Sequence, residues 1–513
     1  DWGGRVVRWS HGTMKPCVAY AIVLIFTLSL SFGSFELLSN FVVNGPKFMV
    51  FNDREGPCWS QGGFKHRFHS SWSDGSRKGT QSQLAIMYTA ENTTLAEELS
   101  VQYRDASSVT GSFKTARARR VQVPEEYNTN WYEAEIKGLN ASTTYQFLIQ
   151  VSEGQWDDRL YEAKTSGKTE AFEFAFFGDS GLWGREDGLA TGTTDVIDLI
   201  SSWKQQLFVI AAGDFAYFNT DDRFDQLEDA INAWFDQIQP YASKFVVMPT
   251  YGNHELSYLR ENLTEWKEKF RVPKGFSMNS SRELMRLLSG TEDISLTSKS
   301  QPSYYAFTVG TVRFVSILGI QSLRKRGLKS MPDEALDWIE KELRASSRDR
   351  SIKWIIPFFH VAPFADGFSH PSVKTLREQL GPLFQKYGVR IVLNAHDQNY
   401  ERTLPLVIVN EDDYVVTSQE TDCYDRRTNG TIYVKTSPGG KKSNIGNTFS
   451  KFQTDPPPEY TAFRDDDQHH VLQIRVEENG DEIVAKSWGL PGEGEEPFLL
   501  EEFRYTLAER CNE

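Results

Sequence analysis

Five short apolar runs in this chain each end at polar residues that can bind a metal. The runs are AFEFAFF (171–177) before Gly178-Asp179, LFVIAA (207–212) before Gly213-Asp214-Phe215-Ala216-Tyr217, FVVMPTY (245–251) before Gly252-Asn253-His254-Glu255, IKWIIPFF (352–359) before His360, and VRIVLNA (389–395) before His396. Continuous apolar runs of this length predict strands buried on both faces, as in a sheet covered by helices. Because ligands of such sheets gather beyond the carboxyl ends of the strands, these side chains are expected to converge on one site. Two Asp, a Tyr, an Asn and two His at one place indicate a two-metal hydrolase.

The composition describes an acidic globular protein. The formal net charge is −14. The length of 513 residues leaves room for two domains and an export segment. No cluster of Lys and Arg is arranged to follow a nucleic-acid backbone, so nucleic acid is not expected as a partner. An anionic substrate would need local positive charge, which bound metals can supply.

Residues 14–33 are predicted to be an export segment. Met14-Lys15 opens an uncharged apolar stretch over 16–35, and Ser31-Phe32-Gly33 offers small residues for cleavage. This pattern is typical of a signal peptide and implies a secreted or vacuolar-lysosomal protein. The alternative is an uncleaved membrane anchor, because the stretch is close to the roughly 20 residues that a span needs. Residues 1–13 are assigned no function.

Asn-x-Ser/Thr sequons and cysteines bear on the same question. The sequons lie at Asn92, Asn140, Asn262, Asn279 and Asn429. They predict a glycoprotein of the secretory pathway. The cysteines after the export segment are Cys58, Cys423 and Cys511. An odd number allows one disulfide, and which pair forms stays open.

The chain is expected to fold as two domains. Residues 47–168 show short runs of partial alternation between turn residues, which predicts a β-sandwich. From 171 to 511 strands alternate with helical patterns, as in the apolar stripe that follows Met331-Pro332, and this predicts an α/β domain. Strand signals return from residue 464 and are interpreted as edge strands of that domain. His469-His470 in this tail is expected to be solvated.

Taken together, the motifs resemble those of a known family. They are Gly-Asp-Ser-Gly (178–181), Gly-Asp-x-x-Tyr (213–217), Gly-Asn-His-Glu (252–255), His360 after a buried strand, Ala-His-x-x-x-Tyr-Glu-Arg (395–402) and a closing segment at 432–440. In order and spacing they resemble the purple acid phosphatases over about residues 47–510. The run from Leu139 to Tyr145 is also similar to the tyrosine corner of fibronectin type III domains. The resemblance implies a fibronectin III-like β-sandwich followed by a four-layer αββα metallophosphoesterase domain.

The resemblance implies two metal ions. The expected ligands are Asp179 and Tyr217 for a ferric ion, Asp214 as a bridge, and Asn253, His360 and His396 for a divalent ion (zinc, manganese or iron). Hard carboxylate and phenolate oxygens suit trivalent iron, and imidazoles suit a divalent ion. Two such ions can clamp a phosphoryl group and generate a bound hydroxide that attacks phosphorus.

Two further histidines are expected to act on the substrate. His254 would contact phosphate oxygens, and His370 would act as general acid near the leaving group. As alternatives, His254 orients Asn253 or the bridging ligand, and His370 is an exposed loop residue. A lone Asp or His after a strand is more often structural, but the coincidence of all these residues in the family's order favours metal binding.

One ligand position departs from the family. The family's last motif is Gly-His-x-His, and here it reads Ala395-His396-Asp397-Gln398. Gln398 therefore stands where a ligand of the ferric ion is expected, while Asp397 occupies the intervening position and is expected to point away. Gln398 can ligate through its carbonyl oxygen, can leave the first metal loosely held, or can mark a chain that has lost activity.

The sequence predicts a secreted, metal-dependent acid phosphatase that acts on phosphomonoesters. A phosphodiesterase or nucleotide pyrophosphatase on the same site is the enzymatic alternative. A non-catalytic glycoprotein with a relict site is the other. The expected partners are small phosphorylated substrates, with a membrane only if residues 16–35 are an anchor. The oligomeric state stays open, with a homodimer as one option.

Overall fold

The structure, a computed structural model, describes residues 65–91, 96–108, 110–121, 129–256, 262–277, 301–318, 330–492 and 495–511. From His66 onward these residues belong to one unit. The predicted export segment, Cys58 and the sequons at Asn92 and Asn279 lie outside the described residues. Asn140 and Asn429 are exposed, as glycosylation would require.

The first part of the described chain is built from strands and one short helix. Its elements are β1 (Phe68–Ser71), α4 (Arg77–Ser82), β2 (Gln83–Thr89), β3 (Glu98–Asp105), β4 (Lys114–Arg120), β5 (Trp131–Lys137), β6 (Thr144–Ser152), β7 (Gln155–Trp156) and β8 (Tyr161–Lys164). Antiparallel pairing joins these strands in the order β1, β2, β5, β4, β3 and β6, and β7 and β8 both pair with β6. Buried and partly exposed residues alternate along β6, so one face of this strand packs inward.

A hydrogen bond marks the corner that leads into β6. The hydroxyl of Tyr145 accepts the backbone N–H of Asn140 at 2.8 Å. A tyrosine that bonds back to the backbone a few residues upstream is the corner device of immunoglobulin-like sandwiches.

Two sheets form the second part of the chain. The first sheet contains β9 (Phe172–Phe177), β10 (Gln206–Ala212), β11 (Val246–Thr250), β19 (Cys423–Tyr424), β22 (His469–Val476), β23 (Glu482–Leu490) and β24 (Phe498–Thr506). The second contains β12 (Tyr305–Val309), β13 (Val312–Ser316), β14 (Trp354–Phe358), β15 (Ile391–Asn394), β20 (Ile432–Thr436), β16 (Tyr400–Thr403) and β21 (Thr461–Asp465), in that order. A small third sheet pairs β17 (Leu406–Ile408) with β18 (Tyr414–Val416). The five apolar runs form β9, β10, β11, β14 and β15, and β9–β11 are parallel neighbours.

The two large sheets pack face to face through aromatic rings. Phe174 and Phe208 of the first sheet meet Phe314 of the second edge-on, with ring centroids 5.1 and 5.3 Å apart. Aromatic pairs prefer this arrangement, and it fixes the distance between the sheets.

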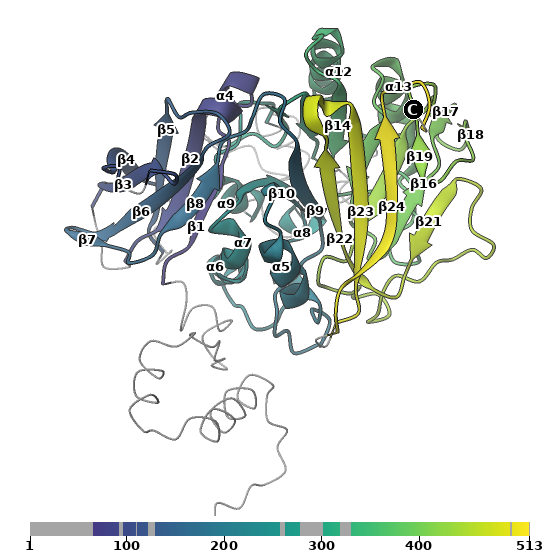
Figure 1. Cartoon of the computed structure of the whole chain (residues 1–513). Helices are drawn as coiled ribbons and strands as arrows, with labels where there is room; N and C mark the ends of the chain where they lie inside the picture. Colours follow the sequence, from purple (N-terminus) through teal and green to yellow (C-terminus); the bar gives the residue numbers. More distant parts are fainter. Residues whose placement is uncertain are drawn as a thin grey trace, which may run out of the picture. The chain divides into compact units, whose positions relative to one another are not determined.

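Helices cover the outer faces of the sheet pair (Figure 1). They are α5 (Thr193–Ser202), α6 (Leu227–Gln237) and α7 (Gln239–Ala242) on the first sheet's side and α12 (Asp333–Arg348) and α13 (Lys374–Lys386) on the second sheet's side. The short helices α8 (Asn253–Leu256) and α9 (Asn262–Glu268) follow β11. The predicted helix after Met331-Pro332 is confirmed as α12. It has two acids in its first turn and buries Ile339 and Leu343. Helices thus lie on both sides of the pair of sheets, which confirms an α/β domain.

Two expectations about the C-terminal tail are wrong. The strands β22 and β23 lie inside the first sheet, because β22 pairs with both β9 and β23, and β23 also pairs with β24. His469 and His470 are buried at 1% and 0% exposure. The ring of His470 lies 2.9 Å from the carbonyl oxygen of Ser437 and 3.0 Å from a carboxylate oxygen of Asp465, so hydrogen bonds compensate for its burial.

Cys423 and Cys511 form a disulfide, which resolves the pairing that the sequence left open. The bond fastens β19 to the segment that follows β24.

Among the described residues, no helix combines the length and the apolar character that a membrane span requires.

Candidate metal centre

Four of the predicted site residues have left-handed backbone at the carboxyl ends of their strands. The φ angles are 59° at Asp179, 53° at Asp214, 54° at Tyr217 and 80° at His396. Such angles are uncommon outside glycine and cost about 1–3 kcal/mol each, so the surrounding structure must hold them in place. Gly213 has a φ of +85°, and a Cβ there would lie 2.4 Å from the backbone nitrogen of Gly252. The loops after β10 and β11 can therefore approach only if this residue is glycine.

One group of side chains brings two imidazoles onto a carboxylate. Nε2 of His360 lies 3.0 Å from Oδ2 of Asp214 and 3.1 Å from Nδ1 of His396. The possible ligand atoms of these three buried residues all lie within 4.8 Å of one another. The amide oxygen of Asn253 is buried and has no hydrogen-bond partner among the described residues. We call Asp214, His360, His396 and Asn253 the histidine site.

A second group surrounds Asp179. The hydroxyl of Tyr217 donates to Oδ1 of Asp179 at 2.6 Å, and Nε2 of Gln398 donates to the same oxygen at 3.0 Å. Oδ2 of Asp179 accepts the hydroxyl of Ser437 at 2.6 Å and the N–H of His396 at 2.8 Å. We call Asp179, Tyr217 and Gln398 the tyrosine site.

Charge and burial act in opposite directions in the histidine site. Burial lowers the pKa of His360, but the carboxylates of Asp214 and Asp179 outweigh burial and raise it to about 9. Burial lowers the pKa of His254 to about 4 and holds that of His396 well below its ordinary value. The negative charges of Asp214 and Asp179 therefore act mainly on His360, and they would also attract a cation bound at the same place.

His254 lies beside both groups. Its ring is 4.1 Å from the ring of Tyr217, and its Nδ1 is 2.5 Å from the amide oxygen of Asn219. Its Nε2 lies 3.9 Å from Oδ2 of Asp214, and its side chain keeps 16% exposure. This nitrogen can reach a ligand that binds at the two sites.

His370 packs against the histidine site. Its ring stacks on that of His396 with a centroid distance of 4.1 Å. The structure therefore brings the proposed general acid to a metal-site histidine rather than leaving it on a remote loop.

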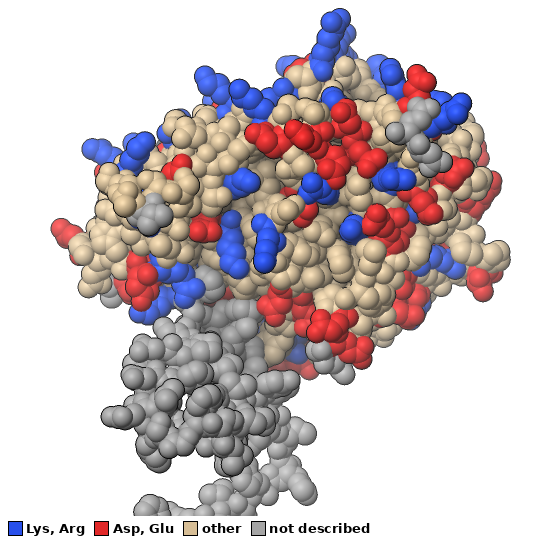
Figure 2. Space-filling view, in the orientation of Figure 1, with Lys and Arg blue, Asp and Glu red and all other residues tan. Residues whose placement is uncertain are grey.

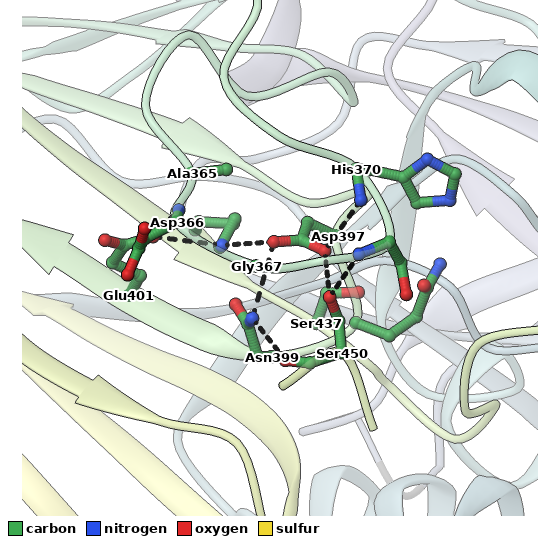
Figure 3. Close-up of polar contacts among 12 residues, drawn as sticks. Ala365, Asp366, Gly367, His370, Asp397, Asn399, Glu401, Ser437 and Ser450 are labelled. Atoms are coloured by element: carbon green, nitrogen blue, oxygen red, sulfur yellow. Dashed lines mark hydrogen bonds and ion pairs between the residues drawn. The ribbon is translucent and has the colours of Figure 1, made fainter. Parts of the chain in front are cut away.

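A buried polar network fixes the loop that carries His370 (Figure 3). Oδ1 of Asp397 accepts the N–H of His370 at 3.2 Å, and Oδ2 accepts Nζ of Lys435 at 2.9 Å. Nζ of Lys435 also reaches Glu401 at 3.1 Å, and Glu401 in turn accepts the N–H of Asp366 at 2.9 Å. Asp397 points away from the metal site, as expected, and both ends of the segment 366–370 are tied to one buried cluster.

Three residues of the centre were missed by the sequence reasoning. Ser437 bonds Asp179, and Nζ of Lys441 lies 4.1 Å from the ring centroid of Tyr217. Glu255 accepts the N–H groups of Asp214, Phe215 and Gly252 and so holds two ligand loops together. Ser437 lies in the closing segment at 432–440 and Glu255 in Gly-Asn-His-Glu (252–255), but nothing in the sequence pattern shows where their side chains point.

Comparisons with known proteins agree with this architecture. The calcineurin-like phosphoesterase family matches residues 172–400. Probable purple acid phosphatase 20 of Arabidopsis thaliana is 24% identical over 416 residues, which span 76% of this chain and 84% of that protein. Acid phosphatase A of Cryphonectria parasitica is 23% identical over 339 residues, which span 55% of this chain and 66% of that protein. The purple acid phosphatase PPD1 from yellow lupin seeds has the same fold, with a TM-score of 0.63 at 18% identity over 87% of this chain and 74% of that one.

Residues 172–400 thus match the calcineurin-like phosphoesterase family, and the chain is similar to purple acid phosphatases. The likeness to purple acid phosphatases implies a dinuclear metal centre, so each of the two groups of donors is expected to bind one cation. The histidine site fits a divalent cation, because two imidazoles and the carboxylate of Asp214 lie within 4.8 Å of one another. The tyrosine site does not fit a second cation in this arrangement, because Oδ1 of Asp179 already accepts Tyr217 and Nε2 of Gln398, so Gln398 turns a donor and not its carbonyl oxygen toward the carboxylate.

Proposed function

We propose that this chain is a secreted, metal-dependent acid phosphatase that hydrolyses phosphomonoesters. The observation that carries the proposal is the convergence of Asp214, His360 and His396 at the carboxyl ends of their strands, with His254 beside Asp214 and His370 stacked on His396. The phosphatase relatives support the reaction class.

The residues of the histidine site would hold a divalent ion such as zinc, manganese or iron. When bound, the ion supplies a Lewis acid for a phosphoryl oxygen and makes a water molecule more acidic. His254, which keeps an exposed edge, would orient the phosphate oxygens, and His370 would give a proton to the leaving alcohol.

Glu255 and Asp397 would position this machinery without touching the substrate. Glu255 accepts the N–H of Asp214 with one carboxylate oxygen and that of Phe215 with the other, and Asp397 accepts the N–H of His370. Positioned groups of this kind lower the barrier by keeping the reactants in a productive geometry.

The remaining assignments concern the rest of the chain. We infer a fibronectin III-like domain at 47–168 and a catalytic domain at 171–511. Support for the first comes from the antiparallel pairing of β2 to β6 and from the Asn140–Tyr145 hydrogen bond. The exposed sequons at Asn140 and Asn429 support passage through the secretory pathway. On the face drawn in Figure 2, Lys and Arg are interspersed with Asp and Glu and form no continuous basic track.

Hydrolysis of para-nitrophenyl phosphate and of its bis ester by the secreted protein, at about pH 5, tests the function. Turnover of the mono ester that is abolished by a chelator and restored by added metal is the expected result. Preference for the bis ester would assign a phosphodiesterase. No turnover of either ester after addition of iron, zinc and manganese would refute the enzyme and leave a non-catalytic glycoprotein.

A further inference from the structure

The carboxylate of Asp179 is fully occupied by protein donors. Tyr217 and Gln398 donate to one oxygen, and Ser437 and the N–H of His396 donate to the other, at distances of 2.6 to 3.0 Å. A carboxylate offers about four acceptor positions. All of them are filled without a metal ion, and a cation could bind here only by displacing at least one donor.

The backbone decides which end of the Gln398 amide faces Asp179. Nε2 of Gln398 donates to the carbonyl oxygen of His396 at 2.8 Å as well as to Asp179, and it lies 3.4 Å from the hydroxyl of Tyr217. If the amide turned over, its oxygen would face two acceptors that have no hydrogen to give. The amide therefore presents N–H groups, which have no lone pair for a metal. Its oxygen is buried without a partner among the described residues, so the chain maintains this orientation against a cost.

A lysine brings positive charge to the same place. Nζ of Lys441 lies over the ring of Tyr217 at 4.1 Å from its centroid, and the backbone N–H of Lys441 donates to the carbonyl oxygen of Asp179 at 3.0 Å. Lys441 is fully buried, and its Nζ is held by the carbonyl oxygen of Lys442 and the amide oxygen of Asn444. In its charged form, an ammonium at this distance attracts the anionic groups of the tyrosine site and repels a trivalent ion.

We propose that this chain carries one metal ion, at the histidine site. The amide of Gln398 and the ammonium of Lys441 take the place of a second cation in the tyrosine site. The chain would thus be a single-metal phosphoesterase that takes a divalent ion. In it, protein donors rather than an iron ion bind the carboxylate of Asp179. The inference rests on the proposed function for the chemistry of the site, but its test does not need turnover.

Metal content of the secreted full-length protein tests the inference. The protein is stripped with a chelator, reloaded separately with excess ferric iron, zinc and manganese, desalted, and analysed by plasma mass spectrometry. We expect about one divalent ion per chain and no tyrosinate-to-iron absorption band in the visible range. Two ions per chain, or a visible band that disappears in Tyr217→Phe, would overturn the proposal.

Three variants assign the ion to its site. Gln398→His is expected to raise the metal content to about two ions and to produce the visible band with iron, whereas Gln398→Met should remain at one. His360→Ala should bind almost none. A folded Gln398→His protein that still binds one ion, or a His360→Ala protein that keeps one, would contradict the assignment. Circular dichroism confirms that each variant is folded.

The same samples separate this inference from the proposed function. One ion with no phosphatase activity would refute the function and leave the stoichiometry intact. Two ions with activity would refute the stoichiometry and leave the function intact.

Discussion

Lys435 and Asp397 form a buried ion pair, with Nζ 2.9 Å from Oδ2 and side-chain exposures of 2% and 0%. Asp397 stands between His396 and Gln398 in sequence, and its other oxygen holds the backbone N–H of His370. The pair therefore connects the turn of the metal site with the loop of the proposed general acid. At Gly367 in that loop, a Cβ would lie 2.0 Å from Oδ2 of Asp397, so the network has no room for a side chain there.

Removing one partner of this ion pair should destabilise the fold. Lys435→Met leaves Asp397 and Glu401 buried without their cation, and we expect a loss of about 3–5 kcal/mol in the free energy of unfolding. Asp397→Asn should cost less, because Lys435 keeps Glu401 at 3.1 Å. Urea unfolding of both single variants and the double variant measures the coupling. Additive losses would show that the pair contributes no coupling of its own.

The proposed general acid predicts a dependence on the leaving group. His370→Asn should lower kcat/KM by about 10²–10⁴-fold on phenyl phosphate, whose leaving group needs a proton. The loss on para-nitrophenyl phosphate should be much smaller. His254→Asn is the matched control, since a residue that contacts phosphate oxygens should affect both substrates alike. Equal losses in His370→Asn would remove the acid role.

Glu255 should control metal affinity without being a ligand. Its carboxylate accepts three N–H groups at 2.8 to 2.9 Å, from both loops that carry the divalent site. A glutamine offers one carbonyl oxygen and replaces the other by a donor, so Glu255→Gln should weaken zinc binding by about 10–100-fold. Competition with a chromophoric chelator measures the affinity. Glu340→Gln on α12 removes a carboxylate outside the centre and should leave the affinity unchanged.

Buried histidines should make the fold sensitive to acid. Burial lowers the pKa of His69 and that of His469 to about 3 each, whereas both titrate near 6.5 in an unfolded chain. Below about pH 6.5 the unfolded chain binds protons that the folded chain excludes, so stability falls toward pH 3 by up to about 1.4 kcal/mol per pH unit for each histidine.

His69→Gln isolates the contribution of His69 to the pH dependence of stability. Glutamine can keep the donor that lies 2.8 Å from the carbonyl oxygen of Lys269. Urea unfolding between pH 7 and pH 4 should then show a slope smaller by about one proton. An unchanged slope would mean that His69 titrates in the folded protein as it does in the unfolded chain.

The sequence predicts the strands and the convergence of the site better than it predicts environments. Apolar runs and the residues after them place Asp214 and His396 at strand ends, because period and polarity are local properties. Burial of His469 depends on side chains that pack against it, such as Phe449 and Thr191, and Thr191 is 278 residues away in sequence. Likewise, the amide orientation of Gln398 depends on a carbonyl oxygen, which no residue pattern records.

A backbone link between the two parts of the chain has a consequence for how they can be separated. The strand β1 pairs with β11 at Ser70 and Val246, so the first sheet runs on into the N-terminal strands. Cutting the chain near residue 168 would leave β11 with an open row of N–H and C=O groups, which is a template for aggregation. The linker near residue 168 separates the two parts in sequence, but β1 and β11 remain hydrogen-bonded to each other. The N-terminal strands act as the edge cover of the catalytic sheet, and the shortest soluble form of the enzyme includes them.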